Sequence, residues 1–365
     1  MSSTFEQARD FFLRGLEESN AGRWEAAERQ FLASLSLLPG RASTLLNLGI
    51  ARQRLGHCDD AIGPLEEVLA QEPGNATAWL HLGLAQAETR RRGSALQALD
   101  RAPAIAPDIG IAWSLRGDLL KEQGRTDDAA AAYRKALDLG FEPDVHRYYL
   151  AGLQRGEMPG APPPGYVRQL FDGYAGGFDE HLVQVLGYRA PQLLVQGLDG
   201  ARFEAALDMG CGTGLAAPVL RPIAKRLDGI DLSANMVRRA RELGLYDEVA
   251  EADLVQWLSG SGRRYDLLVA ADVFIYVGTL ERVFEAAARA MHPGGTFCLS
   301  VEAADEQDVE LRSTLRYAHS ERYIRMLAGQ AGFDVRACAR HPLRIDQGRP
   351  LEGLFAWLTL PARDG

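Results

Sequence analysis

The stretch Leu207–Gly214, which reads Leu-Asp-Met-Gly-Cys-Gly-Thr-Gly, decides how the second half of this 365-residue chain folds. The apolar run Ala205–Met209 predicts a short strand, and the glycines that follow predict a turn where a ligand can lie against bare backbone. A second apolar run ends at Asp231, 23 residues after Asp208. An acid at the end of the next strand can accept both hydroxyls of a ribose. The stretch therefore predicts a ligand site at the first turn of a parallel sheet.

The acid in front of the turn indicates the charge of that ligand. Asp208 would repel a pyrophosphate, whereas a carboxylate at this place can hold an ammonium group or lie near a sulfonium. The glycine pattern therefore points away from a dinucleotide and toward a cationic ligand.

Residues 207–214 resemble the first motif of the class I S-adenosylmethionine-dependent methyltransferases, and the resemblance extends over about residues 165–360. It implies S-adenosylmethionine as cofactor, with the glycine turn against its methionine part and Asp231 on its ribose hydroxyls. It also implies that Met236 covers the adenine and that Asp253 reaches the adenine amino group. The expected cofactor-binding residues are Tyr174, Asp208, Gly210, Cys211, Gly212, Gly214, Asp231, Leu232, Met236, Asp253, Leu254 and Ala271.

Short apolar runs alternate with helical patterns after residue 165, which predicts a parallel sheet covered by helices on both faces. The expected strands are 205–209, 226–230, 248–252, 265–271, 295–301, 334–341 and 353–360. A short loop joins the last two, so we expect a seven-stranded, doubly wound, Rossmann-like sheet with its last strand antiparallel at the edge. Ligands bind such sheets at the carboxyl ends of the strands.

Four acids follow strand ends and are expected to converge on one crevice: Asp208, Asp231, Asp253 and Asp272. Each of them, taken alone, is also explained as the cap of the helix that follows, because strand-to-helix turns favour such caps. At the second turn the cap falls to Ser233, which leaves Asp231 for the cofactor.

The segment before the first strand is expected to close over the cofactor. Residues 166–191 contain Gly-Tyr-Ala-Gly-Gly, a weak helix former, and predict two short helices with a joint between them. In related methyltransferases this segment acts as a lid, which implies that Tyr174 touches the methionine end. Packing of Tyr174 against the sheet is an equally good explanation.

Three residues are candidates for catalysis: His319 and His181 as bases, and Tyr276 as a polar wall residue. A base is needed only if the acceptor is a hydroxyl or a protonated amine. A histidine near a cleft is also explained as a hydrogen-bond partner alone. Residues 271–276 read Ala-Asp-Val-Phe-Ile-Tyr and lack Asn-Pro-Pro-Tyr, which argues against methylation of adenine N6 or glutamine.

A period of 34 residues organises the N-terminal part of the chain and resembles the tetratricopeptide repeat. In that repeat, small residues let two antiparallel helices approach, and proline stops the second helix. We expect four repeats, at 8–41, 42–75, 76–109 and 110–143, stacked into an all-α solenoid with a concave groove. The periodic residues are Gly15, Gly49, Gly83 and Gly117, then Ala27, Ala61, Ala95 and Ala129, then Pro39, Pro73 and Pro107.

Three parts are therefore expected along the chain. The repeat domain takes residues 1–155, including a capping helix from 144; a semi-stiff linker with four prolines takes 156–165; and the methyltransferase domain takes 166–365. The repeats, together with 271–276 and the Arg-Tyr-Ala-His-Ser of 316–320, resemble a bacterial group of repeat-containing predicted methyltransferases. That resemblance gives the architecture and the cofactor and leaves the acceptor open.

Composition excludes several classes of function. A net charge of −9 argues against general nucleic-acid binding, and no apolar run is long enough to cross a membrane. The N-terminal residues lack the pattern of a secretory signal. The four cysteines lie far apart without metal-ligand spacing, so we expect no metal site and a cytoplasmic protein with reduced thiols.

Three functions stay open. The first is a methyltransferase whose repeat groove recruits a protein partner or a protein substrate. The second is a small-molecule methyltransferase in which the repeats serve only assembly, for example as a homodimer. The third is a scaffold that binds the cofactor without turning it over. Repeat architecture identifies an interaction surface without naming what it binds.

Overall fold

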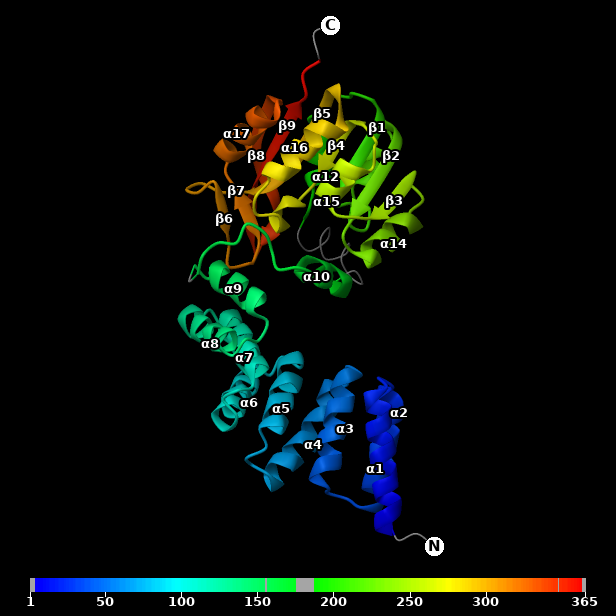
Figure 1. The fold of residues 1–365 in the computed structure, drawn as a ribbon, viewed down its shortest axis with the longest axis vertical. Helices are drawn as coiled ribbons and strands as arrows, with labels where there is room; N and C mark the ends of the chain where they lie inside the picture. The colour runs from blue at the N-terminus through cyan, green and yellow to red at the C-terminus, as the bar shows by residue number, and fades with distance from the viewer. Residues whose placement is uncertain (1–3, 155, 175–186, 347, 363–365) are drawn as a thin grey trace. The chain divides into compact units, whose positions relative to one another are not determined.

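The computed structural model describes residues 4–154, 156–174, 187–346 and 348–362. The chain divides into two compact units, Met1–Leu150 and Ala151–Gly365. Each unit is described by itself below (Figure 1).

The first unit is a series of helix pairs. Consecutive helices pack against each other within each pair, and each pair packs against the next. This arrangement confirms the predicted all-α repeat array. The helices are α1 (Thr4–Asn20), α2 (Trp24–Leu37), α3 (Ala42–Arg54), α4 (Cys58–Gln71), α5 (Ala76–Glu88), α6 (Arg92–Ile105), α7 (Gly110–Glu122) and α8 (Thr126–Asp138), followed by α9 (Pro143–Gly152) across the division between the units.

The periodic glycines stand where two helices of one pair are in closest contact. A Cβ atom built on Gly117 would lie 2.4 Å from the ring of Tyr133, and one on Gly83 would lie 2.7 Å from Leu99. Both distances are shorter than any van der Waals contact, so only glycine fits. The other two pairs repeat this contact, with Gly15 against Phe31 and Gly49 against Leu65.

The periodic prolines stand just after the second helix of each pair. Helix α4 ends at Gln71 before Pro73, and α6 ends at Ile105 before Pro107. The tryptophans of the following helices hold these turns, because Trp79 Nε1 donates to the Pro73 carbonyl at 2.9 Å and Trp113 Nε1 to the Pro107 carbonyl at 3.0 Å. The prolines therefore end the helices, as predicted.

The second unit contains a mainly parallel sheet in the order β3-β2-β1-β4-β5. β9 pairs antiparallel with both β5 and β8, so the last strand is antiparallel, as predicted, and lies one strand in from that end of the sheet. The strands are β1 (Phe203–Met209), β2 (Ala224–Asp231), β3 (Glu248–Glu251), β4 (Tyr265–Ala270), β5 (Met291–Ala303), β6 (Val309–Leu311), β7 (Tyr317–His319), β8 (Asp334–Asp346) and β9 (Arg349–Thr359).

Alternate residues of the central strands point into two separate cores. Leu207 and Leu268 belong to the core under α15 (Leu254–Gly260), α16 (Glu281–Ala290) and α17 (Glu321–Ala331). Ala206 and Leu267 belong to the core under α12 (Ala190–Gln196) and α13 (Ala217–Leu220). Helices therefore cover both faces, which confirms the doubly wound architecture. The described residues of this unit also form α10 (Tyr166–Tyr174), α14 (Ala234–Glu242) and the 3₁₀ turn η3 (Phe274–Tyr276).

Two short strands, β6 and β7, were not predicted from the sequence. β5 runs on to Ala303, and its last residues pair with Ala318 and His319 of β7. The three-residue runs of β6 and β7 are too short to show an alternating pattern. β7 pairs with the extension of β5 on one side and with β6 on the other.

The proline-rich segment before α10 is hydrogen-bonded to other residues of the second unit. The Gly160 carbonyl accepts from the backbone N–H of Thr279 at 2.9 Å, and the Pro159 carbonyl accepts from the Tyr317 hydroxyl at 2.9 Å. Gly278 has no room for a side chain, since its Cβ would lie 2.4 Å from the Gly160 oxygen. The boundaries given above for the three parts of the chain stay a prediction.

Candidate functional site

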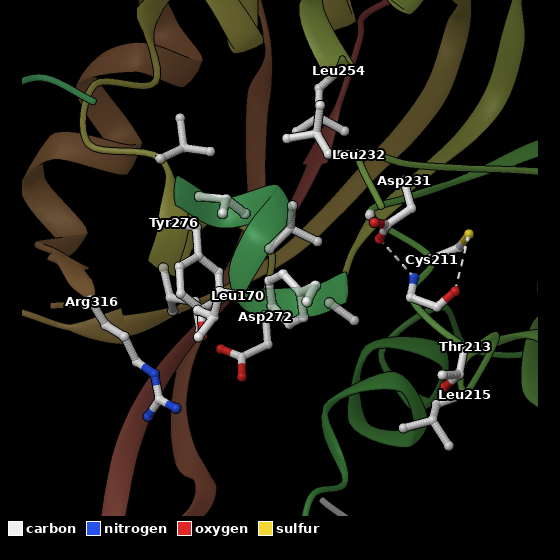
Figure 2. A pocket seen from close by; sticks show the side chains of 18 of the residues that line it. Leu170, Cys211, Thr213, Leu215, Asp231, Leu232, Leu254, Asp272, Tyr276 and Arg316 are labelled. Atoms are coloured by element: carbon white, nitrogen blue, oxygen red, sulfur yellow. Dashed lines mark hydrogen bonds between the residues drawn. The ribbon is translucent and has the colours of Figure 1, made fainter. Parts of the chain in front are cut away.

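A cavity of about 410 Å³ lies at the carboxyl ends of β1 to β4, where the sheet topology places a ligand. Figure 2 shows Asp231, Cys211 and Thr213 on one side of it, and Asp272, Tyr276 and Arg316 on the other. Of the expected cofactor residues, these line it: Asp208, Gly210, Cys211, Gly212, Asp231, Leu232, Asp253, Leu254 and Ala271.

The glycine turn and the acid of the second strand are joined by hydrogen bonds. Gly210 and Gly212 have φ values of 67° and 55°, a region that side-chain-bearing residues adopt at a cost. In this conformation the backbone N–H of Gly212 donates to Asp231 Oδ2 at 2.9 Å, while the N–H of Ser233 donates to Oδ1 at 2.9 Å. The Asp231 carboxylate is thereby held at the cavity wall in one orientation. Ser233 caps α14, as predicted.

Asp208 is buried at the bottom of the turn and bonded to a residue that the sequence did not single out. Tyr246 donates its hydroxyl proton to Asp208 Oδ2 at 2.6 Å. Burial, against the lowering effect of the Tyr246 hydrogen bond and together with the nearby charge of Asp231, raises the pKa of Asp208 to about 7. A cation bound beside it would favour the charged carboxylate.

Asp253 both caps a helix and lines the cavity. Its Oδ1 accepts from the backbone N–H of Gln256 at 3.0 Å and so caps α15. The same side chain also lines the cavity. A helix cap uses one carboxylate oxygen, so it does not conflict with the expected contact to the adenine, which stays a prediction.

Two expected cofactor residues lie away from the cavity lining. Met236 is completely buried in the first turn of α14. Gly214, with φ of 96°, lies where a Cβ would meet Leu243 and Tyr246. Gly214 therefore packs against the end of α14, and Met236 is buried within that helix, so neither lines the cavity.

The placement of His319 corrects its assignment as a base. It is fully buried on β7, its Nε2 pairs with the Gly278 carbonyl at 2.9 Å, and its ring stacks on Tyr323. Burial lowers its pKa to about 4, which keeps it neutral. It does not line the cavity, because pairing of β7 with β5 turns it into the interior.

The structure describes the side chain of Tyr276 but not those of Tyr174 and His181. Tyr276 lines the cavity, with its ring edge-on to that of Phe171 at 5.1 Å between centroids. Tyr174 is the last residue of α10, and its side chain lies outside the described part of the structure. His181 also lies outside the described residues.

A buried network of ion pairs surrounds Asp272, across the cavity from Asp231, and was not predicted from the sequence. Arg344 of β8 is 2% exposed and contacts Asp272 at 2.5 Å, and it also pairs with Glu302 of β5. Glu302 is bound in turn by Arg312 at 3.0 Å. Asp272 and Arg344 line the cavity, and Glu302 and Arg312 stand behind them. Burial raises the pKa of Glu302 against the opposing effect of Arg344.

The described residues contain no group of three or more His, Cys, Asp or Glu side chains that could hold a metal ion. Among the helices of the same residues, none is both long enough and apolar enough to cross a bilayer.

Two family models match the chain. The model described as a methyltransferase domain matches residues 207–299, and the tetratricopeptide-repeat model matches 46–108, 94–144 and 114–161. The first match begins at the glycine turn and ends in β5, so it contains the glycine turn and Asp231 at the cavity wall.

Curated relatives are similar over the second unit. A trans-aconitate 2-methyltransferase of Afipia carboxidovorans is 33% identical over 159 residues, covering 42% of this chain and 59% of the relative. A malonyl-[acyl-carrier protein] O-methyltransferase of Enterobacter lignolyticus is 27% identical over 162 residues, covering 43% and 63%. The chain spans about half the length of the curated relatives it matches, at 48% and 59% for two of them.

Solved structures are similar to each half of the chain at modest scores. The N-methyltransferase NodS of Bradyrhizobium japonicum, in complex with S-adenosylhomocysteine, aligns at TM-score 0.44 and 20% identity, covering 53% of this chain and 98% of that one. A MamA protein aligns at 0.38 and 27%, covering 40% and 80%. The tetratricopeptide-repeat model thus matches the helical part of the chain, and the methyltransferase-domain model matches the part of the sheet that carries the glycine turn.

Proposed function

We propose that the protein is an S-adenosylmethionine-dependent methyltransferase. The carrying observation is the Asp231 carboxylate, fixed by the N–H groups of Gly212 and Ser233 at the wall of the cavity. That geometry suits the two hydroxyls of a ribose, and the buried carboxylate of Asp208 suits the positive charge of the methionine part. When bound, the cofactor supplies an activated methyl group. The residues hold it, orient it and exclude water.

Calorimetric titration of the full-length protein with S-adenosylmethionine and with S-adenosylhomocysteine tests this proposal. We expect micromolar binding of both. Asp231→Ala removes the ribose acceptor and should weaken the affinity at least tenfold, about 1.4 kcal/mol. Asp305→Ala is the matched control, since this acid lies in the same unit, is 74% exposed and pairs with Arg340. An affinity unchanged in Asp231→Ala would remove the ribose assignment, and no binding to the folded wild type would remove the proposed function.

The acceptor and the use of the repeats form the second part of the proposal. The relatives are named for trans-aconitate and for a malonyl-[acyl-carrier protein], which supports either a small acid or a protein-bound group as acceptor. We propose that the repeat groove recruits a protein partner or substrate, because the first helices of the pairs keep exposed residues such as Thr77 and Ile111. A small-molecule acceptor with repeats used only for assembly is the alternative.

Paired substitutions on the two kinds of helix separate these uses. Thr77→Arg with Ile111→Arg alters exposed positions of the first helices α5 and α7. Leu32→Arg with Ile105→Arg alters positions of the second helices α2 and α6 that are 43% and 41% exposed. Quantitative mass spectrometry of proteins retained from lysate by the immobilised full-length chain should show at least a fivefold loss for the first pair alone. Equal retention by both variants contradicts recruitment through the first helices.

A further inference from the structure

The cavity has a second side whose chemistry the cofactor does not account for. Its walls come from the residues after β4, from the chain between β6 and β7, and from β8, where Asp272, Arg316 and Arg344 lie. Figure 2 shows Asp272, Tyr276 and Arg316 together there, across the cavity from Asp231. On the basis of the proposed function, this side receives the group that is methylated.

Asp272 has a strained backbone conformation, and two hydrogen bonds hold the residue in it. Its φ is +61°, which few residues other than glycine, asparagine and aspartate adopt. Its backbone N–H donates to Ser300 Oγ at 2.9 Å, and its Oδ2 accepts from Arg344 Nη1 at 2.5 Å. The side chain is 11% exposed and lines the cavity. Strain of this kind is concentrated at functional sites.

Burying the charged side chains next to Asp272 costs free energy. Arg344 and Glu302 are each 2% exposed, and taking such charges out of water costs several kcal/mol per ion before their attraction offsets it. Packed apolar side chains would serve stability as well. The network therefore has the character of a support that fixes one carboxylate at a cavity wall.

Two polar atoms of the ion pair lack partners among the described residues. Asp272 Oδ1 can only accept a hydrogen bond, and Arg344 Nε can only donate one; both are buried and unpaired. An unmade hydrogen bond of this kind costs about 1–3 kcal/mol. The carboxylate torsion is soft, so a small rotation of Asp272 presents either oxygen to a bound group.

We propose that the methyl acceptor is a hydroxyl group and that Asp272 takes its proton. A hydroxyl has both a proton to donate to Asp272 and lone pairs to accept from Arg344. A carboxylate has no proton to donate to Asp272, and an ammonium group has no lone pair to accept from Arg344. Asp272 and Arg344 are the catalytic residues, because both contact the acceptor, and Glu302 is a positioning residue.

The transfer balances without a further reactant. The hydroxyl oxygen forms its bond to the methyl carbon while the bond from that carbon to sulfur breaks and leaves its electron pair on sulfur. The hydroxyl proton passes to the Asp272 carboxylate and from there to water. The products are a methyl ether, the neutral thioether and one proton.

Three matched probes test the preference for a hydroxyl. The full-length protein, saturated with S-adenosylhomocysteine, is titrated with 4-fluorophenol, 4-fluorobenzoate and 4-fluorobenzylamine and followed by fluorine NMR. We expect the phenol to bind at least fivefold more tightly than the other two, and Asp272→Asn, which suits the positive φ, to abolish that preference. Asp305→Asn is the control and should keep it. Equal binding of the probes, tighter binding of the benzoate or amine, or an unchanged preference in Asp272→Asn overturns the inference.

Labelled transfer gives a second readout. The protein is incubated with methyl-tritiated S-adenosylmethionine and a bacterial metabolite extract, and the product is treated with mild alkali. A product that is stable to alkali and is not retained on a cation exchanger is neither an ester nor an amine and supports the inference, with its formation at least 100-fold slower in Asp272→Asn. Release of labelled methanol indicates an ester, and retention on a cation exchanger indicates an amine; either overturns it. Failure of S-adenosylhomocysteine to bind contradicts the proposed function itself and is seen before any probe is added.

Discussion

Arg344→Met should destabilise the second unit by about 3–5 kcal/mol, the usual cost of removing one partner from a buried ion pair. The substitution keeps the length of the apolar stem and removes the guanidinium between Asp272 and Glu302. Burial lowers the pKa of Arg344, but the two carboxylates outweigh this and raise it above its usual value, so the charge is lost only by substitution. Two carboxylates then stay buried with Arg312 alone beside Glu302.

Hydrogen exchange in increasing urea, read by mass spectrometry on peptides from 203–360, measures this loss for the second unit separately. Peptides from the repeat helices serve as the internal reference, because they should be unaffected. The loss should be smaller at pH 5 than at pH 8, since burial raises the pKa of Glu302, and without Arg344 this carboxyl takes up a proton in the folded state and loses its buried charge. Arg344→Met combined with Asp272→Asn and Glu302→Gln should recover part of the stability. A loss below 1 kcal/mol in the single variant would show that the guanidinium does not hold the network.

Gly117→Ala and Gly93→Ala should change stability in opposite directions although the substitution is the same. At Gly117 the added Cβ would lie 2.4 Å from the Tyr133 ring, and that ring is fixed by its hydroxyl bond to Asp118 at 2.8 Å. We expect a loss of about 1–3 kcal/mol from overpacking, even after the gain in helix propensity. Gly93, in the first turn of α6, has nothing within 4 Å of the added atom and should gain up to about 1 kcal/mol.

Urea unfolding of the full-length variants, followed by exchange in peptides from the repeat helices, compares the two. Peptides from 203–360 should be unchanged in both variants and control for differences in preparation. Equal effects of the two substitutions would contradict the assignment of Gly117 to a close helix contact.

Structural features that repeat along the sequence, or that involve a few neighbouring residues, could be predicted from it. The 34-residue period places each glycine, and the structure shows each opposite a large side chain of the partner helix. The glycine turn and Asp231 were also predictable, because a strand, a turn and an acid follow one another closely. Their hydrogen bonds then fix the acid at the cavity.

Features assembled from distant residues were not readable. The ion network joins residues 272, 302, 312 and 344, which share no spacing and come together only through β5 and β8. His319 was a candidate base in the sequence analysis. Pairing of the three-residue strand β7 with β5 buries it instead, and that pairing depends on the length of β5.

The equal spacing of the glycines and their partners bears on how the repeat region can change by mutation. Gly49 meets Leu65 and Gly83 meets Leu99 with the same geometry, so a duplication or loss of one whole period keeps every helix contact of this kind in register. A gain or loss of any other number of residues within a helix separates a glycine from its large partner. The repeat region can therefore lengthen or shorten during evolution in steps of 34 residues, whereas smaller insertions and deletions are confined to its turns.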